Sequence, residues 1–150
     1  MKITLALLAI VGGFFMMLIG GDYRLNLTHS YPLGFYQIVS SDTYSKGDFI
    51  AFCPPDVPVI QLAVERGYLQ WGACSGGSTP LIKTVIATQG DQLAFDDVVS
   101  MNGQPLTNYV IHRADDNGRT LPLLAPFTVA ENEFFALSEY APSNSFDGRY

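Results

Sequence analysis

The chain has 150 residues, enough for one globular domain with a short additional segment. Its formal net charge is −6 and only eight residues are Lys or Arg, so no extended basic patch can form and we expect no nucleic-acid partner. Hydrophobic residues make up 48% of the chain and are concentrated at its start.

The first predicted element is an apolar helix over residues 1–21, MKITLALLAIVGGFFMMLIGG, in which only Lys2 is charged. At about 1.5 Å per residue its apolar run nearly spans the roughly 30 Å hydrocarbon core of a bilayer. A cleaved signal peptide has a shorter apolar region and ends in a small-residue cleavage site, which residues 18–21 (LIGG) do not provide. We therefore expect a single transmembrane anchor in the inner (cytoplasmic) membrane, with the lipid bilayer as a partner. Lys2 favours the cytoplasmic side, so residues 22–150 would lie outside the cytoplasm, in the periplasm if the source is a Gram-negative bacterium.

The rest of the chain alternates short strand patterns with turn residues. Aromatic and β-branched residues favour strands at 34–39, 48–53, 81–88, 109–112 and 128–140. Asn102-Gly103 between short apolar runs predicts a hairpin, and Asn117-Gly118 predicts a further strand pair. This spacing with few helices predicts a mostly β, antiparallel, coiled or barrel-like domain.

Two cysteines flank a segment of the domain that lacks a strand pattern. Cys53 and Cys74 would close a loop of about twenty residues, and a disulfide there would add about 3 kcal/mol of stability. Residues 57–68 between them favour a short helix or a compact excursion, so residues 53–80 form a predicted stapled insertion. A metal site needs more ligands than two cysteines, and the two histidines lack zinc-finger spacing, so no metal or cofactor is expected.

Lys83 is the candidate catalytic base. It lies in the middle of the predicted strand 81–88, with apolar residues on both faces. One interpretation is an edge-strand lysine that discourages aggregation. The other is a buried lysine, whose lowered pKa would let the neutral amine take a proton from a serine hydroxyl.

Ser30, in NLTHSYPLGFY at 26–36, is the candidate nucleophile for that base. A Ser–His–Asp triad is a poorer reading, because His29 is adjacent to Ser30 and neighbouring side chains of an extended segment point apart. His112 is near a strand end, where a surface position is the default, and the chain has no G-x-S-x-G motif. Ser30 with Lys83 is therefore the best pair.

Three segments, NLTHSYPLGFY, LIKTVIATQGD and SFDGRY, resemble the type I signal peptidase superfamily in their order and spacing. CPP at 53–55, ERGYLQWGAC and PLIK are similar to its conjugative-transfer branch, the TraF-type peptidases. The resemblance implies a domain of signal-peptidase type with Ser30 as nucleophile and Lys83 as general base. It also implies an oxyanion hole formed by the Thr28 hydroxyl and the backbone N–H of Ser30.

The SFDGRY segment carries the supporting residues that the resemblance implies. Ser145 would orient the lysine amine, and Asp147 with Arg149 would form a structural ion pair. Gly148 stands where the family usually has Ser, and relatives continue beyond the position of Tyr150 with a further strand. An inactive, truncated peptidase copy is therefore one alternative expectation.

The resulting functional hypothesis is a membrane-anchored serine endopeptidase, a signal peptidase that removes leader peptides from pilin or secreted-protein precursors. The resemblance implies small residues such as Ala before the scissile bond, and either hydrolysis or pilin cyclisation as the final step. The rival hypothesis is a non-catalytic membrane-anchored β-domain in a secretion or pilus assembly, in which Lys83 is a surface residue and Ser30 only shapes a turn.

Overall fold

The computed structural model describes residues 4, 7, 10–13, 16, 20–143 and 145–150. These residues contain nine strands, and every strand pairing is antiparallel. The predicted mostly β, antiparallel character is therefore confirmed.

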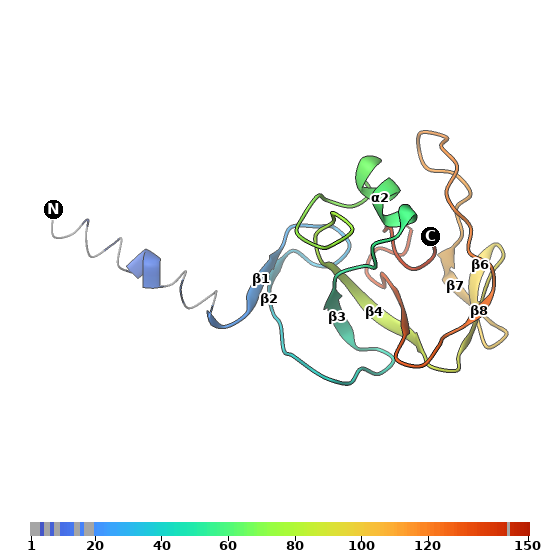
Figure 1. Ribbon diagram of the computed structural model, residues 1–150, viewed down its shortest axis with the longest axis horizontal. Helices are drawn as coiled ribbons and strands as arrows, with labels where there is room; N and C mark the ends of the chain where they lie inside the picture. The colour runs from blue at the N-terminus through green and yellow to red at the C-terminus, as the bar shows by residue number, and fades with distance from the viewer. Residues whose placement is uncertain (1–3, 5–6, 8–9, 14–15, 17–19, 144) are drawn as a thin grey trace.

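The strands are divided among three sheets rather than joined in one coiled sheet (Figure 1). A hairpin pairs β1 (Tyr23–Asn26) with β2 (Gly34–Gln37). The three-stranded sheet has β4 (Leu81–Thr88) between β3 (Phe49–Phe52) and β9 (Phe134–Leu137). The four-stranded sheet has the order β7-β6-β5-β8, with bounds Gln104–Val110, Val98–Met101, Gln92–Phe95 and Phe127–Thr128.

The main hydrophobic core lies between the two larger sheets. Its fully buried members come from β4, β5, β6 and β9 and include Ala87, Leu93, Val99 and Leu137. The register between β4 and β9 shifts between Val85 and Ala87, and such bulges bend a strand and increase its twist. This core holds β4, the strand that carries Lys83, in the middle of its sheet.

The turn signals had mixed outcomes. The hairpin predicted at Asn102-Gly103 is confirmed, since β6 and β7 pair there and both turn residues have positive φ, 53° and 77°. Around Asn117-Gly118 the structure has only an isolated bridge between Ala114 and Thr120, not a strand pair. The strand expected over 128–140 is broken by a turn at Asn132, φ 62°, which separates β8 from β9.

The predicted disulfide and helix are both present. Cys53 and Cys74 are bonded, with a sequence separation of 21 residues. The helix α2 (Pro58–Glu65) lies within that loop and begins with a proline, whose missing N–H costs nothing in the first turn. It ends sooner than the predicted 57–68 because Gly67, with φ 77°, turns the chain away.

The predicted transmembrane helix requires correction. A span needs about 20 consecutive apolar helical residues, and no helix among the described residues is long and apolar enough to cross a membrane. The longest described helical run of the first twenty positions is 10–13, and much of 1–21 lies outside the described residues. The predicted location, a single pass through the inner membrane with a periplasmic domain, depended on that helix and is contradicted with it. The boundary between residues 1–21 and 22–150 stays a prediction.

Candidate active site

Ser30 lies in the loop, residues 27–33, that joins β1 to β2. Two contacts tie this loop to the three-stranded sheet. Ser138, just after β9, donates a 2.8 Å hydrogen bond to the carbonyl oxygen of Ser30. Tyr31 is 3% exposed, and its hydroxyl lies 2.6 Å from Oγ1 of Thr84 on β4. The loop that carries the half-buried Ser30 is thus held against the three-stranded sheet.

Lys83 lies on β4, the middle strand of its sheet, and is only 2% exposed. The edge-strand interpretation is therefore wrong. Its Nζ atom donates a 2.6 Å hydrogen bond to Oγ of Ser145. The same Ser145 hydroxyl lies 3.4 Å from Oγ of Ser30. The fold therefore brings together three side chains that are far apart in the sequence.

The surroundings of Lys83 shift its protonation equilibrium toward the neutral form. Burial lowers the pKa of Lys83 from 10.5 to about 8, because water no longer solvates the ammonium group. The carboxylate of Asp147 opposes this pKa shift, and the positive charge of Arg149 adds to it. A substantial fraction of the amine is therefore neutral near pH 8, as a general base requires.

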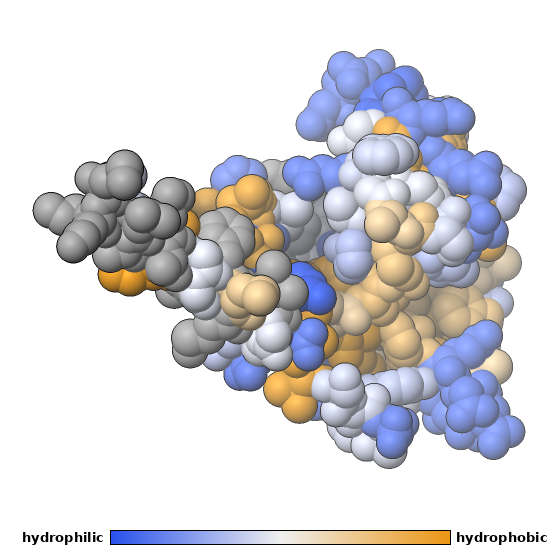
Figure 2. Space-filling view, turned by 60° about the vertical axis from the view of Figure 1, so that its left-hand side comes forward, coloured by the Kyte–Doolittle hydropathy of each residue, from blue (hydrophilic) through white to orange (hydrophobic). Residues whose placement is uncertain are grey.

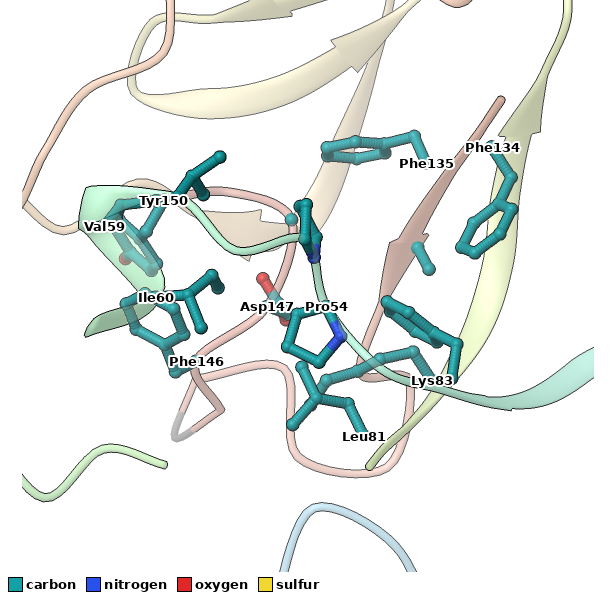
Figure 3. A pocket seen from close by; sticks show the side chains of 15 residues that line it. Pro54, Val59, Ile60, Leu81, Lys83, Phe134, Phe135, Phe146, Asp147 and Tyr150 are labelled. Atoms are coloured by element: carbon teal, nitrogen blue, oxygen red, sulfur yellow. The ribbon is translucent and has the colours of Figure 1, made fainter. Parts of the chain in front are cut away.

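A mostly apolar cavity of about 260 Å³ adjoins Lys83 (Figure 3). The close-up shows the lysine side chain at its edge, with Pro54 and the Asp147 carboxylate nearby. Its walls come from the end of β3, the start of the insertion, β4, β9 and the C-terminal loop, and they include Phe52, Pro54, Leu81, Phe134, Phe146 and Tyr150. Apolar surroundings of this kind disfavour the charged ammonium, in line with the lowered pKa of Lys83.

Asp147 and Arg149 form a buried ion pair, with side chains 0% and 1% exposed. The guanidinium binds both carboxylate oxygens, at 2.8 and 3.1 Å. It also donates to the carbonyl oxygens of Ser145 and Val110, at 3.0 and 2.9 Å. The pair therefore fixes the backbone of Ser145, the residue that contacts Lys83.

Thr28 is half-buried in the Ser30 loop, two residues before the serine. Its hydroxyl donates to Oδ1 of Asn26 at 2.7 Å. Its part in an oxyanion hole stays a prediction, as do the roles of Ser30 and Lys83. His29 and His112 are both exposed, which leaves the lysine as the buried base candidate beside Ser30.

Sequence reasoning missed three residues that hold the Ser30 loop: Asn26, Tyr31 and Ser138. Asn26 and Tyr31 lie within NLTHSYPLGFY, where a buried polar side chain next to the nucleophile could have been suspected. Ser138 had no such signal, because its contact with Ser30 joins positions 108 residues apart.

Exposed apolar side chains lie in and beside the Ser30 loop, residues 27–33. Leu27, Leu33 and Phe35 are 60–67% exposed, and Phe49 on neighbouring β3 is 49% exposed. Figure 2, turned toward the β1–β2 side, shows hydrophobic surface there and across the middle of the face. Such a surface suits an extended apolar peptide better than a charged ligand.

No group of three or more His, Cys, Asp or Glu residues in the described part of the chain could hold a metal ion.

Comparisons with known proteins show the family of the chain. A family model described as "Signal peptidase, peptidase S26" matches residues 1–150. The chain is 38% identical over 149 residues to a plasmid transfer protein TraF of Escherichia coli, covering 95% of this chain and 83% of that one. No solved structure matches the chain.

Two further relatives come from other bacteria. A probable conjugal transfer protein TraF of Sinorhizobium fredii is 38% identical over 131 residues, covering 87% of this chain and 69% of that protein. A conjugal transfer protein TraF of Agrobacterium tumefaciens is 38% identical over 133 residues, covering 88% and 74%. The chain therefore belongs to the signal peptidase family, peptidase S26, and is a TraF-type member of it.

Proposed function

We propose that this protein is a serine endopeptidase with a Ser30–Lys83 dyad that removes leader peptides from pilin or secreted-protein precursors during conjugal transfer. The observation that carries the proposal is the buried Lys83, whose amine contacts Ser145 while Ser145 contacts Ser30. The peptidase family and the transfer-protein names of the relatives support the reaction class and the setting.

The first step uses neutral Lys83 as the base. Its lone pair takes the proton of the Ser30 hydroxyl, with Ser145 holding both groups in place. The Ser30 oxygen then attacks the scissile carbonyl carbon. The negative charge that develops on the carbonyl oxygen is stabilised by the backbone N–H of Ser30 and the hydroxyl of Thr28.

The second step reverses the proton transfer. The Lys83 ammonium gives its proton to the leaving amine, and the acyl group stays on Ser30. Water, or an amine of the substrate itself, then displaces Ser30 from the ester. The first acceptor gives hydrolysis and the second gives a cyclic product.

The substrate would bind as an extended chain beside the Ser30 loop, where Leu27, Leu33 and Phe35 expose apolar surface. Small residues such as Ala before the scissile bond suit a nucleophile that is half-buried. A leader peptide, with its apolar segment and small-residue junction, has both properties.

The test is cleavage of a synthetic precursor peptide with Ala before the scissile bond, measured by mass spectrometry. We expect the wild type to cleave it and Ser30→Ala and Lys83→Met to be inert, with the exposed Ser40→Ala as the matched control. Cleavage by Lys83→Met would exclude the proposed base. A folded but inert wild type on several precursors would favour a non-catalytic β-domain in a secretion or pilus assembly.

A further inference from the structure

We propose that Asn26 is a positioning residue that holds the Thr28 hydroxyl in the free enzyme and releases it to the oxyanion in the transition state. This inference rests on the proposed function, because it assumes that Ser30 is the nucleophile and Thr28 an oxyanion donor. It concerns a residue to which no contact with substrate is assigned.

Asn26 is the last residue of β1 and is 5% exposed. Its Nδ2 atom lies 3.1 Å from each of three carbonyl oxygens, those of Thr28, Tyr31 and Pro32. These carbonyls lie on both sides of Ser30, and a side-chain amide has two hydrogens to share among them. One buried side chain thus contacts the loop before and after the nucleophile.

The other end of the same side chain fixes Thr28. Oδ1 of Asn26 accepts from the Thr28 backbone N–H at 3.0 Å and from the Thr28 hydroxyl at 2.7 Å. An amide oxygen has two lone pairs, and both are occupied. The direction of the Thr28 hydroxyl hydrogen is therefore set by Asn26.

This arrangement makes the hydroxyl available late in the reaction. In the free enzyme the hydrogen points to a neutral amide oxygen. A developing oxyanion is a stronger acceptor, since charge-assisted hydrogen bonds are about twice as strong as neutral ones. Rotation about the Cβ–Oγ1 bond of Thr28 then transfers the donor from Asn26 to the substrate oxygen.

Release of the hydroxyl leaves Asn26 satisfied. Its Oδ1 keeps the hydrogen bond from the Thr28 N–H, so no buried acceptor is orphaned when the hydroxyl turns away. The hydroxyl therefore stabilises the transition state more than the ground state, and such an interaction raises kcat rather than lowering KM.

The loop has other supports that remain when Asn26 is changed. Ser138 binds the Ser30 carbonyl, and the Tyr31 hydroxyl contacts Thr84 and the carbonyl oxygen of Leu137. These contacts come from the three-stranded sheet and do not pass through Asn26. A variant at Asn26 therefore tests the orientation of Thr28 while the sheet still anchors the nucleophile.

The experiment measures kcat and KM on the precursor peptide for Asn26→Ala, Thr28→Val, Thr28→Ser and the Asn26→Ala/Thr28→Val double variant. Loss of one oxyanion donor lowers kcat by about 10²–10³-fold, which we expect for Thr28→Val. Asn26→Ala acts through that donor, so its loss of kcat should lie between about tenfold and that limit. Thr28→Ser should keep most of the activity, and the exposed Asn108→Ala is the matched control.

The double variant decides between positioning and general loop support. We expect it to be no slower than Thr28→Val alone, with KM unchanged throughout. Losses of kcat that multiply, or a raised KM with unchanged kcat, would overturn the proposal. Wild-type kcat in Asn26→Ala, beside an inert Ser30→Ala, would overturn this inference and leave the proposed function standing. An inert wild type would overturn both.

A second substitution covers the case in which Asn26→Ala does not fold. Asn26→Asp keeps an acceptor for the Thr28 hydroxyl but makes it charged, so release costs more, and it also replaces the Nδ2 donor by an oxygen. The part of the loss in kcat that disappears when Thr28→Val is added reports the release of the hydroxyl. Circular dichroism monitors folding of each variant. If neither variant folds, Asn26 is a folding determinant and the positioning role is refuted.

Discussion

Nζ of Lys83 lies 2.6 Å from Oγ of Ser145, and this contact joins the middle strand of a sheet to the C-terminal loop. The loop is itself held by the Asp147–Arg149 pair, through the bond from Arg149 to the Ser145 carbonyl. The position of the amine therefore depends on two distant parts of the chain at once.

The pH dependence of cleavage should follow the protonation of Lys83. Burial lowers the pKa of Lys83 to about 8, and only the neutral amine can act as base. We expect kcat/KM to fall about tenfold for each pH unit below an apparent pKa near 8 and to level off above it, where the amine is neutral. A profile with a single rise near pH 6.5 would point to a histidine instead.

Replacing Lys83 should stabilise the fold while it abolishes activity. The folded pKa of about 8 lies below the unfolded value of 10.5, so the unfolded chain binds more protons between these pH values. Wild-type stability should therefore rise with pH across this window by on the order of 2–3 kcal/mol. Lys83→Met should lose that rise and be the more stable protein at pH 7. Urea unfolding at pH 7 and pH 10.5 tests this; parallel curves for the two proteins would contradict it.

Removing one charge of the buried ion pair should be costly. Asp147→Asn leaves the Arg149 guanidinium buried without its carboxylate, which typically costs about 3–5 kcal/mol. Loss of the Asp147 charge also removes an interaction that raises the pKa of Lys83, so the rise in kcat/KM should move below pH 8. The control is Asp97→Asn, which removes one charge of an exposed ion pair with 3.9 Å between Oδ1 of Asp97 and Nη2 of Arg113. We expect the free energy of unfolding of this variant to change little.

Gly148 should not tolerate a side chain without a shift of its neighbours. A Cβ atom there would lie 2.8 Å from the carbonyl oxygen of Ala136 and 2.8 Å from Cε2 of Phe135. We expect Gly148→Ala to lower the free energy of unfolding by about 1–3 kcal/mol. Adding Phe135→Leu should relieve only the clash with the ring, because the Ala136 carbonyl remains. An unchanged melting temperature for Gly148→Ala would contradict this prediction and show that β9, which carries Phe135 and Ala136, shifts at no cost in stability.

Loss of the disulfide should destabilise the insertion without removing the catalytic groups. Cys53 and Cys74 are separated by 21 residues, and a loop of that size contributes about 3 kcal/mol through chain entropy. We expect the Cys53→Ser/Cys74→Ser variant to unfold at a lower urea concentration than the wild type and to retain cleavage at low temperature. Dithiothreitol should lower the wild-type midpoint to that of the variant and leave the variant unchanged.

The sequence by itself determined the local elements of this protein. Runs such as LIKTVIAT and the Asn102-Gly103 turn predicted β4 and the β6–β7 hairpin, because strand propensity and turn geometry depend on neighbouring residues. The cysteine pair and the candidates Ser30 and Lys83 were also found from the sequence, the last two with help from a family resemblance. The first strand, β1, was missed because its four residues offer no strong pattern.

Only the tertiary structure decided whether these residues meet. An apolar strand that contains one lysine fits an exposed edge or a buried centre equally well, and the choice depends on what covers it. Here β3 and β9 flank β4, and the C-terminal loop covers Lys83 and brings Ser145 to its amine. The contacts from Ser138 to Ser30 and from Lys83 to Ser145 join positions 108 and 62 residues apart. Local sequence cannot specify such contacts, because they form only when separate sheets and loops pack together.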